Sequence, residues 1–182
     1  MNVLKKSGWL GFLVILVWAG QLWSEEIRLR ADGTGDYVTI QEAIGAAFEG
    51  DEIVLEEGIY RGAGNRDLDM GGKHLTIRSI DPEDREVVRA TVIDCEGSAL
   101  ERHRGFYFDS GEGLDSVVSG LTIEHGYHLD GGGIYCTGEC NPTIRNCIIQ
   151  YGHAERDGGG VQCNSSRMTL INCDIIHNTA GQ

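Results

Sequence analysis

Histidine and tyrosine side chains recur at matching positions in the second half of the chain and are candidate ligand contacts. His125, Tyr151 and His177 follow one another at intervals of 26 residues, and Tyr127 lies two positions after the first of them. Flat rings in a row can stack against sugar rings, and extended solenoid faces often bind extended ligands. We therefore predict a ligand-binding strip of these four residues. The alternative is that they are half-buried loop residues that close the edge of a core.

Two aspartates that each precede a glycine triplet, Asp130 and Asp157, are the candidate metal ligands. If they stack on adjacent turns of the chain, their carboxylates could share a calcium ion with carbonyl oxygens of the loop. Calcium takes about six or more oxygens, however, and Asp-Gly is also ordinary turn chemistry. We therefore predict no cofactor and no metal, with calcium at these two residues as the alternative.

Six cysteines accompany these residues, and their spacing favours packing over chemistry. Cys136 and Cys163 share one repeat position, and Cys147 and Cys173 share another. At inward positions a free cysteine behaves as a small apolar side chain. A local disulfide between Cys136 and Cys140 is the alternative in an oxidising compartment. No cluster of histidines accompanies this pair, so a zinc site is disfavoured.

An internal repeat predicts the elements that must position these side chains. The segments Val118–Ile123, Ile144–Ile149 and Leu170–Ile175 align at a spacing of 26 residues, and Gly131–Cys136 recurs 27 residues later as Gly158–Cys163. Apolar and polar residues alternate at the end of the second block, which is the period of a half-buried strand. The repeat therefore predicts short strands, each stacked on its counterpart one turn away at about 4.8 Å.

Between the apolar columns lie two columns that contain only glycine and asparagine, which adopt a left-handed backbone at low cost. We predict that both columns form corners: Gly120, Asn146 and Asn172 in one, and Gly126, Gly152 and Asn178 in the other. Stacked strands joined by such corners predict an all-β fold, a right-handed parallel β-helix solenoid with about three short strands per coil.

The upstream half of the chain is less regular. Its segment Thr39–Phe48 has helical spacing of apolar residues and a capping box from Thr39 and Glu42, and it predicts an amphipathic helix that covers the first coil. We predict long loops at Arg61–Gly72 and Asp81–Arg89. The far end lacks such a cover, so we expect the solenoid to be truncated and to continue past Gln182. Four further segments are strand-like: Ile53–Leu55, Leu75–Ile77, Thr91–Ile93 and Phe106–Phe108.

The amino terminus has the layout of a secretory signal peptide. Lys5 and Lys6 precede an apolar run from Trp9 to Ala19, which is shorter than the roughly 20 residues of a membrane-spanning helix. We predict a signal peptide over residues 1–24 and a β-helix over residues 25–182. The chain is then secreted or on the cell surface, without a membrane span beyond the signal segment. An uncleaved membrane anchor is the alternative.

The charge of the chain excludes one class of partner. All 28 acidic residues follow Ser24, and the formal net charge of the whole chain is −13. Such a surface repels phosphate backbones, so we expect no nucleic-acid binding. Among the short arginine clusters, Arg102–Arg104 is the most basic.

Several motifs resemble those of a known superfamily. The opening Asp32-Gly-Thr-Gly-Asp36, continued to Ile44 and followed by Gly58–Tyr60, resembles the start of pectin-lyase-like β-helix proteins. The Gly-Gly-Gly-Ile and Gly-Gly-Gly-Val blocks, with Ile175–Asn178, are similar to repeats of polymorphic outer-membrane proteins and of β-helix proteins exported by planctomycete-type bacteria. The resemblance covers the whole chain after the leader. It implies the right-handed β-helix fold and is weak for function.

The resemblance carries over no catalytic residue, because the catalytic phrases of pectin methylesterases, polygalacturonases and pectate lyases do not occur in this sequence. His153, near Glu155 and Asp157, could act as an acid–base group but has no nucleophile beside it. We therefore lean towards a monomeric, non-catalytic exported module that binds polysaccharide or a cell-envelope component. The alternative is a polysaccharide-active enzyme, of pectate lyase, polygalacturonase or pectin esterase type, whose active site lies on coils absent from this chain.

Overall fold

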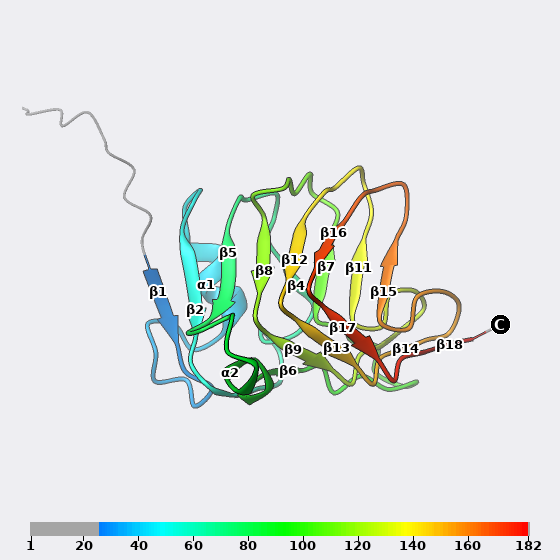
Figure 1. Cartoon of the computed structure of the whole chain (residues 1–182), viewed down its shortest axis with the longest axis horizontal. Helices are drawn as coiled ribbons and strands as arrows, with labels where there is room; N and C mark the ends of the chain where they lie inside the picture. The colour runs from blue at the N-terminus through cyan, green and yellow to red at the C-terminus, as the bar shows by residue number, and fades with distance from the viewer. Residues whose placement is uncertain (1–25, 182) are drawn as a thin grey trace, which may run out of the picture.

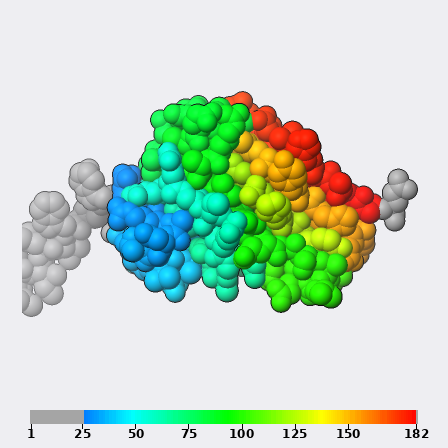
Figure 2. Space-filling view, turned by 90° about the horizontal axis from the view of Figure 1, so that it is seen from below, coloured from blue at the N-terminus to red at the C-terminus, as the bar shows by residue number. Residues whose placement is uncertain are grey.

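Four parallel sheets run side by side along the long axis of the molecule, and the chain passes from one to the next in each turn of a right-handed solenoid (Figure 1). The structure is a computed structural model that describes residues 26–181. Figure 2 shows the coils following one another in chain order from the amino-terminal to the carboxy-terminal end. The right-handed parallel β-helix predicted from the repeat is confirmed.

Two of the sheets meet at the first corner of each coil. We call them sheets A and B. Sheet A contains β1 (Glu26–Leu29), β2 (Glu52–Leu55), β5 (Thr76–Ser79), β8 (Val117–Ser119), β12 (Thr143–Arg145) and β16 (Thr169–Ile171). Sheet B contains β3 (Gly58–Tyr60), β6 (Thr91–Asp94), β9 (Thr122–Glu124), β13 (Ile148–Gln150) and β17 (Asp174–Ile176).

The other two sheets complete the coil. Sheet C contains β4 (Leu68–Asp69), β7 (Phe106–Phe108), β11 (Ile134–Cys136) and β15 (Val161–Cys163). Sheet D contains β10 (Tyr127–His128), β14 (His153–Ala154) and β18 (Thr179–Ala180), and it lies between sheets B and C in chain order. The regular coils therefore have four strands, whereas about three were predicted. The strands of sheet D were missed because two residues are too few to show a period.

The register of the strands follows the repeat. Ile149 pairs with Ile123 on one side and with Ile175 on the other. Ile144 of sheet A pairs in the same way, and Ile134 of sheet C pairs with Val161 at the 27-residue spacing. The columns continue upstream, where longer loops change the spacing but not the stacking.

The inward columns form one apolar core along the axis. Ile77, Ile123, Ile144 and Ile149 are fully buried, and the rings of Phe106 and Phe108 stack there at 6.0 Å. Burying each such side chain contributes roughly 1.5–3 kcal/mol. The core therefore depends on the alternation of inward and outward residues in strands of three or four residues.

One corner column has the expected left-handed backbone, and the other is displaced by one residue. Asn146 and Asn172 have φ of 55° and 50°, as predicted. In the second column the left-handed residue is not Gly152 but the residue before it, Tyr151, with φ of 54°. Gly152 is required for a different reason, because a Cβ there would lie 2.3 Å from the backbone oxygen of Gly159.

Two helices interrupt the strands. Helix α1 (Ile40–Ala46) begins with the predicted capping box of Thr39 and Glu42, and the side chain of Gln41 exchanges two hydrogen bonds with the backbone of Asp69 in β4. Its role as the cover of the first coil stays a prediction. Helix α2 (Arg85–Ala90) lies where a loop was predicted; its N-cap Asp84 accepts a hydrogen bond from Glu86. A helix of six residues gives no periodic signal.

The six cysteines are free thiols, and the local disulfide alternative is absent. Cys136 and Cys147 are buried, whereas their partners Cys163 and Cys173 lie on the last described coil and are more exposed. The predicted signal peptide lies outside the described residues. Within residues 26–181 no helix has the length and apolar character needed to cross a membrane.

Candidate functional site

Three of the four residues predicted to form the ligand-binding strip stack on one another at the corner between sheets B and D. The rings of His125 and Tyr151 are 5.8 Å apart at 19°, and those of Tyr151 and His177 are 5.4 Å apart at 8°. The ring of Tyr151 stands well out of the surface, since the residue is 51% exposed. The structure therefore brings together the three residues that the repeat aligned.

A second row of rings runs beside the first on sheet D. The ring of Tyr127 lies 4.6 Å from that of His153 at 27°, and the Nδ1 atom of His153 lies 2.8 Å from the hydroxyl of Thr179 on the next coil. His153 thus pairs with a hydroxyl and forms no hydrogen bond or ion pair with Asp157. We call these two rows the ring strip: His125, Tyr127, Tyr151, His153 and His177.

The near-parallel rings of the strip turn their faces towards their neighbours along the axis. Parallel aromatic pairs at these distances prefer an offset arrangement. Of the strip residues, His125, Tyr151 and His177 are exposed, and the other two are half-buried. A ligand lying along the strip would meet ring edges, imidazole nitrogens and a phenol hydroxyl. The strip can therefore combine hydrogen bonding with partial stacking.

Three of the five strip residues have a backbone conformation that is unfavourable for their residue type. His125, Tyr151 and His177 have φ of 55°, 54° and 56°. A side chain other than glycine or asparagine costs roughly 1–2 kcal/mol in this region. At the other left-handed corner the same solenoid uses Asn146 and Asn172. His125, Tyr151 and His177 thus occupy turn positions where glycine or asparagine would be less strained.

Close backbone contacts fix the strip against sheet C. A Cβ on Gly126 would lie 1.8 Å from the backbone oxygen of Gly132, and one on Gly132 would lie 2.5 Å from that of His153. The glycine triplets therefore let the two backbones touch without side chains between them. Sequence analysis identified these glycines by position but not by this contact.

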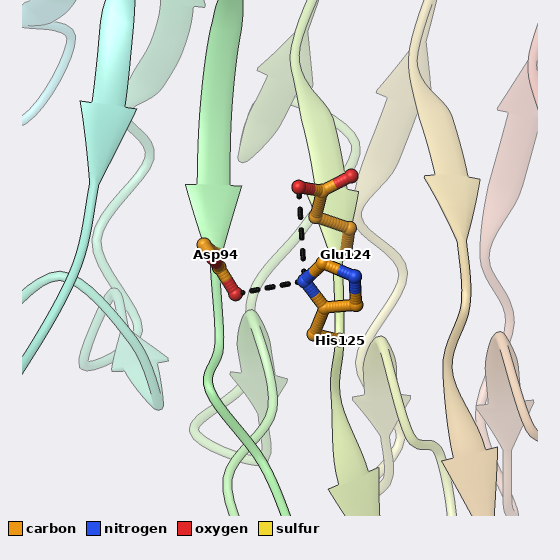
Figure 3. A group of neighbouring side chains, drawn as sticks. All are labelled: Asp94, Glu124 and His125. Atoms are coloured by element: carbon orange, nitrogen blue, oxygen red, sulfur yellow. Dashed lines mark hydrogen bonds and ion pairs between the residues drawn. The ribbon is translucent and has the colours of Figure 1, made fainter.

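His125 of the strip also belongs to a group of three titratable side chains, with Asp94 and Glu124 (Figure 3). The Nδ1 atom of His125 lies 3.0 Å from Asp94, which ends β6, and 3.7 Å from Glu124, which ends β9. Oxygen and nitrogen ligands of this kind could hold a divalent cation. Arg61 already pairs with Asp94 at 2.9 Å, however, and Gln150 donates a hydrogen bond to Glu124. The group therefore carries no metal assignment, although Asp94 can orient the His125 ring.

The two predicted calcium ligands lie on adjacent coils but in different surroundings. Asp130 forms an ion pair with Arg156, whereas Asp157 is exposed. The backbone oxygen of Asp157 accepts a hydrogen bond from Gly131 at 3.0 Å. Calcium at these residues stays the alternative to the predicted absence of a metal.

A pocket that the sequence pattern did not predict lies near the strip. It has a volume of about 370 Å³, and its lining includes Arg104, Tyr107 and Tyr135 from sheet C and the segment before it, with His128 from β10 and Asp130 from the following loop. Asp67 and Arg156 also line it, so its residues come from four successive coils at unequal spacing. The only signal in the sequence was the short basic cluster Arg102–Arg104.

Comparison with known proteins gives a match to the fold. A family model described as a right-handed beta helix region matches residues 79–181. The matched part contains the ring strip and most of the pocket. No curated protein matches the chain.

Proposed function

The chain belongs to the family of proteins with a right-handed β-helix region, and from this premise we propose that it is an exported module that binds polysaccharide or another cell-envelope glycan. The ring strip is its contact surface. The whole chain acts as a monomer on the cell surface or outside it, because the predicted leader directs it to export and each coil stacks only on its neighbours.

The observation that carries this proposal is the strained ring column. Residues held in sparsely populated backbone regions gather at functional sites, and the inference runs from the observed strain to the function. Tyr151 is neither glycine nor asparagine, yet it has φ of 54° and is 51% exposed. Stacking on its neighbours offsets part of the strain, at about 0.5–1.5 kcal/mol. A bound saccharide supplies a reason to retain the rings.

The test is the variant Tyr151→Asn, which removes the ring but keeps a residue suited to the left-handed corner. Loss of one ring contact worth about 1.4 kcal/mol weakens binding roughly tenfold. We expect this loss on a glycan array and in titrations with the glycans that it identifies, with a thermal midpoint close to wild type. The matched control is Phe48→Asn, which removes an exposed ring near the amino-terminal end. Wild-type protein that binds no glycan, or Tyr151→Asn protein that binds as wild type does, contradicts the proposal.

The competing function is a polysaccharide-active enzyme, and the pairing of Asp94 with His125 favours it. A carboxylate on Nδ1 orients an imidazole so that Nε2 can accept a proton. The assay is the release of reducing or unsaturated sugars from acidic polymers. If the protein releases such sugars, and Asp94→Asn abolishes the release while Glu57→Gln on another coil does not, the protein is an enzyme and not a binding module.

A further inference from the structure

The pocket beside the ring strip contains a buried arginine without an acidic partner. Arg104 is 6% exposed, and its Nη1 atom is buried with no hydrogen-bond partner. Among residues 26–181, other arginines such as Arg30 and Arg66 pair with glutamates at 2.9 and 2.8 Å. No carboxylate of the described chain lies within ion-pair distance of the Arg104 guanidinium. A buried unpaired charge is costly, so this position needs an explanation.

The acids that line the pocket are engaged elsewhere. One oxygen of Asp67 accepts a hydrogen bond from the backbone nitrogen of Arg104 at 2.9 Å, and its other oxygen lies 2.6 Å from His103. Asp130 forms its ion pair with Arg156. The positive charge of Arg104 is therefore left without a counter-ion, although carboxylates are near.

Two tyrosines hold the guanidinium in place. Its central carbon lies 5.4 Å from the ring centroid of Tyr107 and 4.9 Å from that of Tyr135, and the two rings stack at 5.8 Å. A cation over aromatic faces is stabilised by roughly 0.5–2 kcal/mol. Burial lowers the pKa of Arg104, which reflects the cost of removing it from water. Because the guanidinium is already desolvated in the folded protein, binding of an anion does not incur this desolvation cost again.

A second polar atom in the pocket is also unpaired. The Nδ1 atom of His128 is buried without a hydrogen-bond partner. The volume of about 370 Å³ falls within the range of about 300–1,000 Å³ that is usual for small-molecule sites. The pocket thus offers a preorganised cation, two ring faces and an imidazole to one compact polar group.

We propose that this pocket binds the oxyanion group, a carboxylate or a sulfate ester, of an acidic saccharide. The planar guanidinium presents its donors as a fork that matches such oxygens. Tyr107 and Tyr135 contact the sugar ring that carries the group, and His128 bonds a hydroxyl. This inference rests on the proposed function and deepens it, because it names the kind of saccharide that the module binds.

The experiment compares ligands that differ only in charge. Full-length protein is titrated with a uronic acid trisaccharide, its methyl ester, a sulfated trisaccharide and the neutral parent sugar. The variants are Arg104→Met, which keeps the length of the stem, and Arg89→Met, which removes an exposed arginine from α2 as the control. We expect wild type and Arg89→Met to bind at least one acidic sugar at least tenfold more tightly than its uncharged counterpart. Arg104→Met should lose this preference.

Stability distinguishes a binding role of Arg104 from a structural one. Burying a charge without a counter-ion is costly, so replacing Arg104 by methionine should leave the thermal midpoint equal to or above that of wild type. A midpoint lowered by several degrees, or an unchanged preference for acidic sugars in Arg104→Met, overturns the inference. If wild type binds all these sugars equally, the pocket inference fails while the proposed function stands. If no saccharide of any kind binds, both fail.

Discussion

The close backbone packing around the glycine triplets should be highly sensitive to a single added methyl group, and Gly132→Ala tests it. A Cβ on Gly132 would lie 2.3 Å from the backbone oxygen of Gly159 and 2.5 Å from that of His153. Real Cβ contacts are almost never shorter than about 3.0 Å, and both obstacles are backbone atoms in hydrogen-bonded coils. The methyl group can be accommodated only if the backbones of Gly159 and His153, both on the next coil, move away from Gly132.

The expected cost follows from these overlaps. Inserting a methylene into a packed interior costs about 1–3 kcal/mol and occasionally more. Because both obstacles are backbone atoms that cannot rotate away, we expect Gly132→Ala to lower the free energy of unfolding by about 3 kcal/mol, the upper end of this range. For a chain of this size each kcal/mol lowers the thermal midpoint by about 2–4 °C, so we expect a decrease of roughly 6–12 °C.

Thermal unfolding followed by circular dichroism measures this difference, and Gly45→Ala is the matched control. Gly45 lies in helix α1, where an added Cβ meets nothing within 4 Å, and alanine in a helix is favoured by about 0.5–1 kcal/mol. The same substitution should therefore raise the midpoint at one site and lower it at the other. A Gly132→Ala midpoint within two degrees of wild type would refute the close approach of Gly132 to the backbone of the next coil.

Two further predictions concern titratable side chains. Alkylation of the native protein should label the two partly exposed thiols, Cys163 and Cys173. After unfolding, mass spectrometry should count six alkylated cysteines, because no disulfide is present. A count of four would instead support the local disulfide between Cys136 and Cys140. Burial, with a smaller contribution from Arg104, lowers the pKa of His128 below 6.5. The unfolded chain therefore takes up this proton first as pH falls, so stability is lost below about pH 6.5 down to the lower folded pKa. The loss of denaturant stability between pH 7 and pH 5 should be smaller in His128→Gln than in wild type, and equal losses would contradict the assignment.

The regular half of the fold could be predicted because its columns have a fixed period. Ile123, Ile149 and Ile175 stack as their spacing requires, and the ring column follows from the same register. The exact corner residue could not be predicted. Glycine signals a left-handed turn and a close backbone approach equally well, and at Gly152 the second cause applies.

The upstream half was predicted less completely, because its loops differ in length from coil to coil. Helix α2 and the strands β1, β3 and β4 have two to six residues each and give no periodic signal. The segment before β7 carries Arg104 into the pocket, but its counterpart on the next coil is a glycine triplet. No alignment of the repeats could have paired this arginine with Tyr135.

The sequence by itself determined which residues share a column, since a constant repeat length forces equivalent side chains onto one line along the axis. It also determined the acidic surface and the lack of a known catalytic phrase. Only the tertiary structure decided which columns become neighbours around the coil. The group formed by Asp94 and His125, and the unpaired Arg104 between two tyrosines, depend on corner angles and loop paths that juxtapose different sheets. Those contacts are set by three-dimensional packing, which has no counterpart in the spacing of residues along the chain.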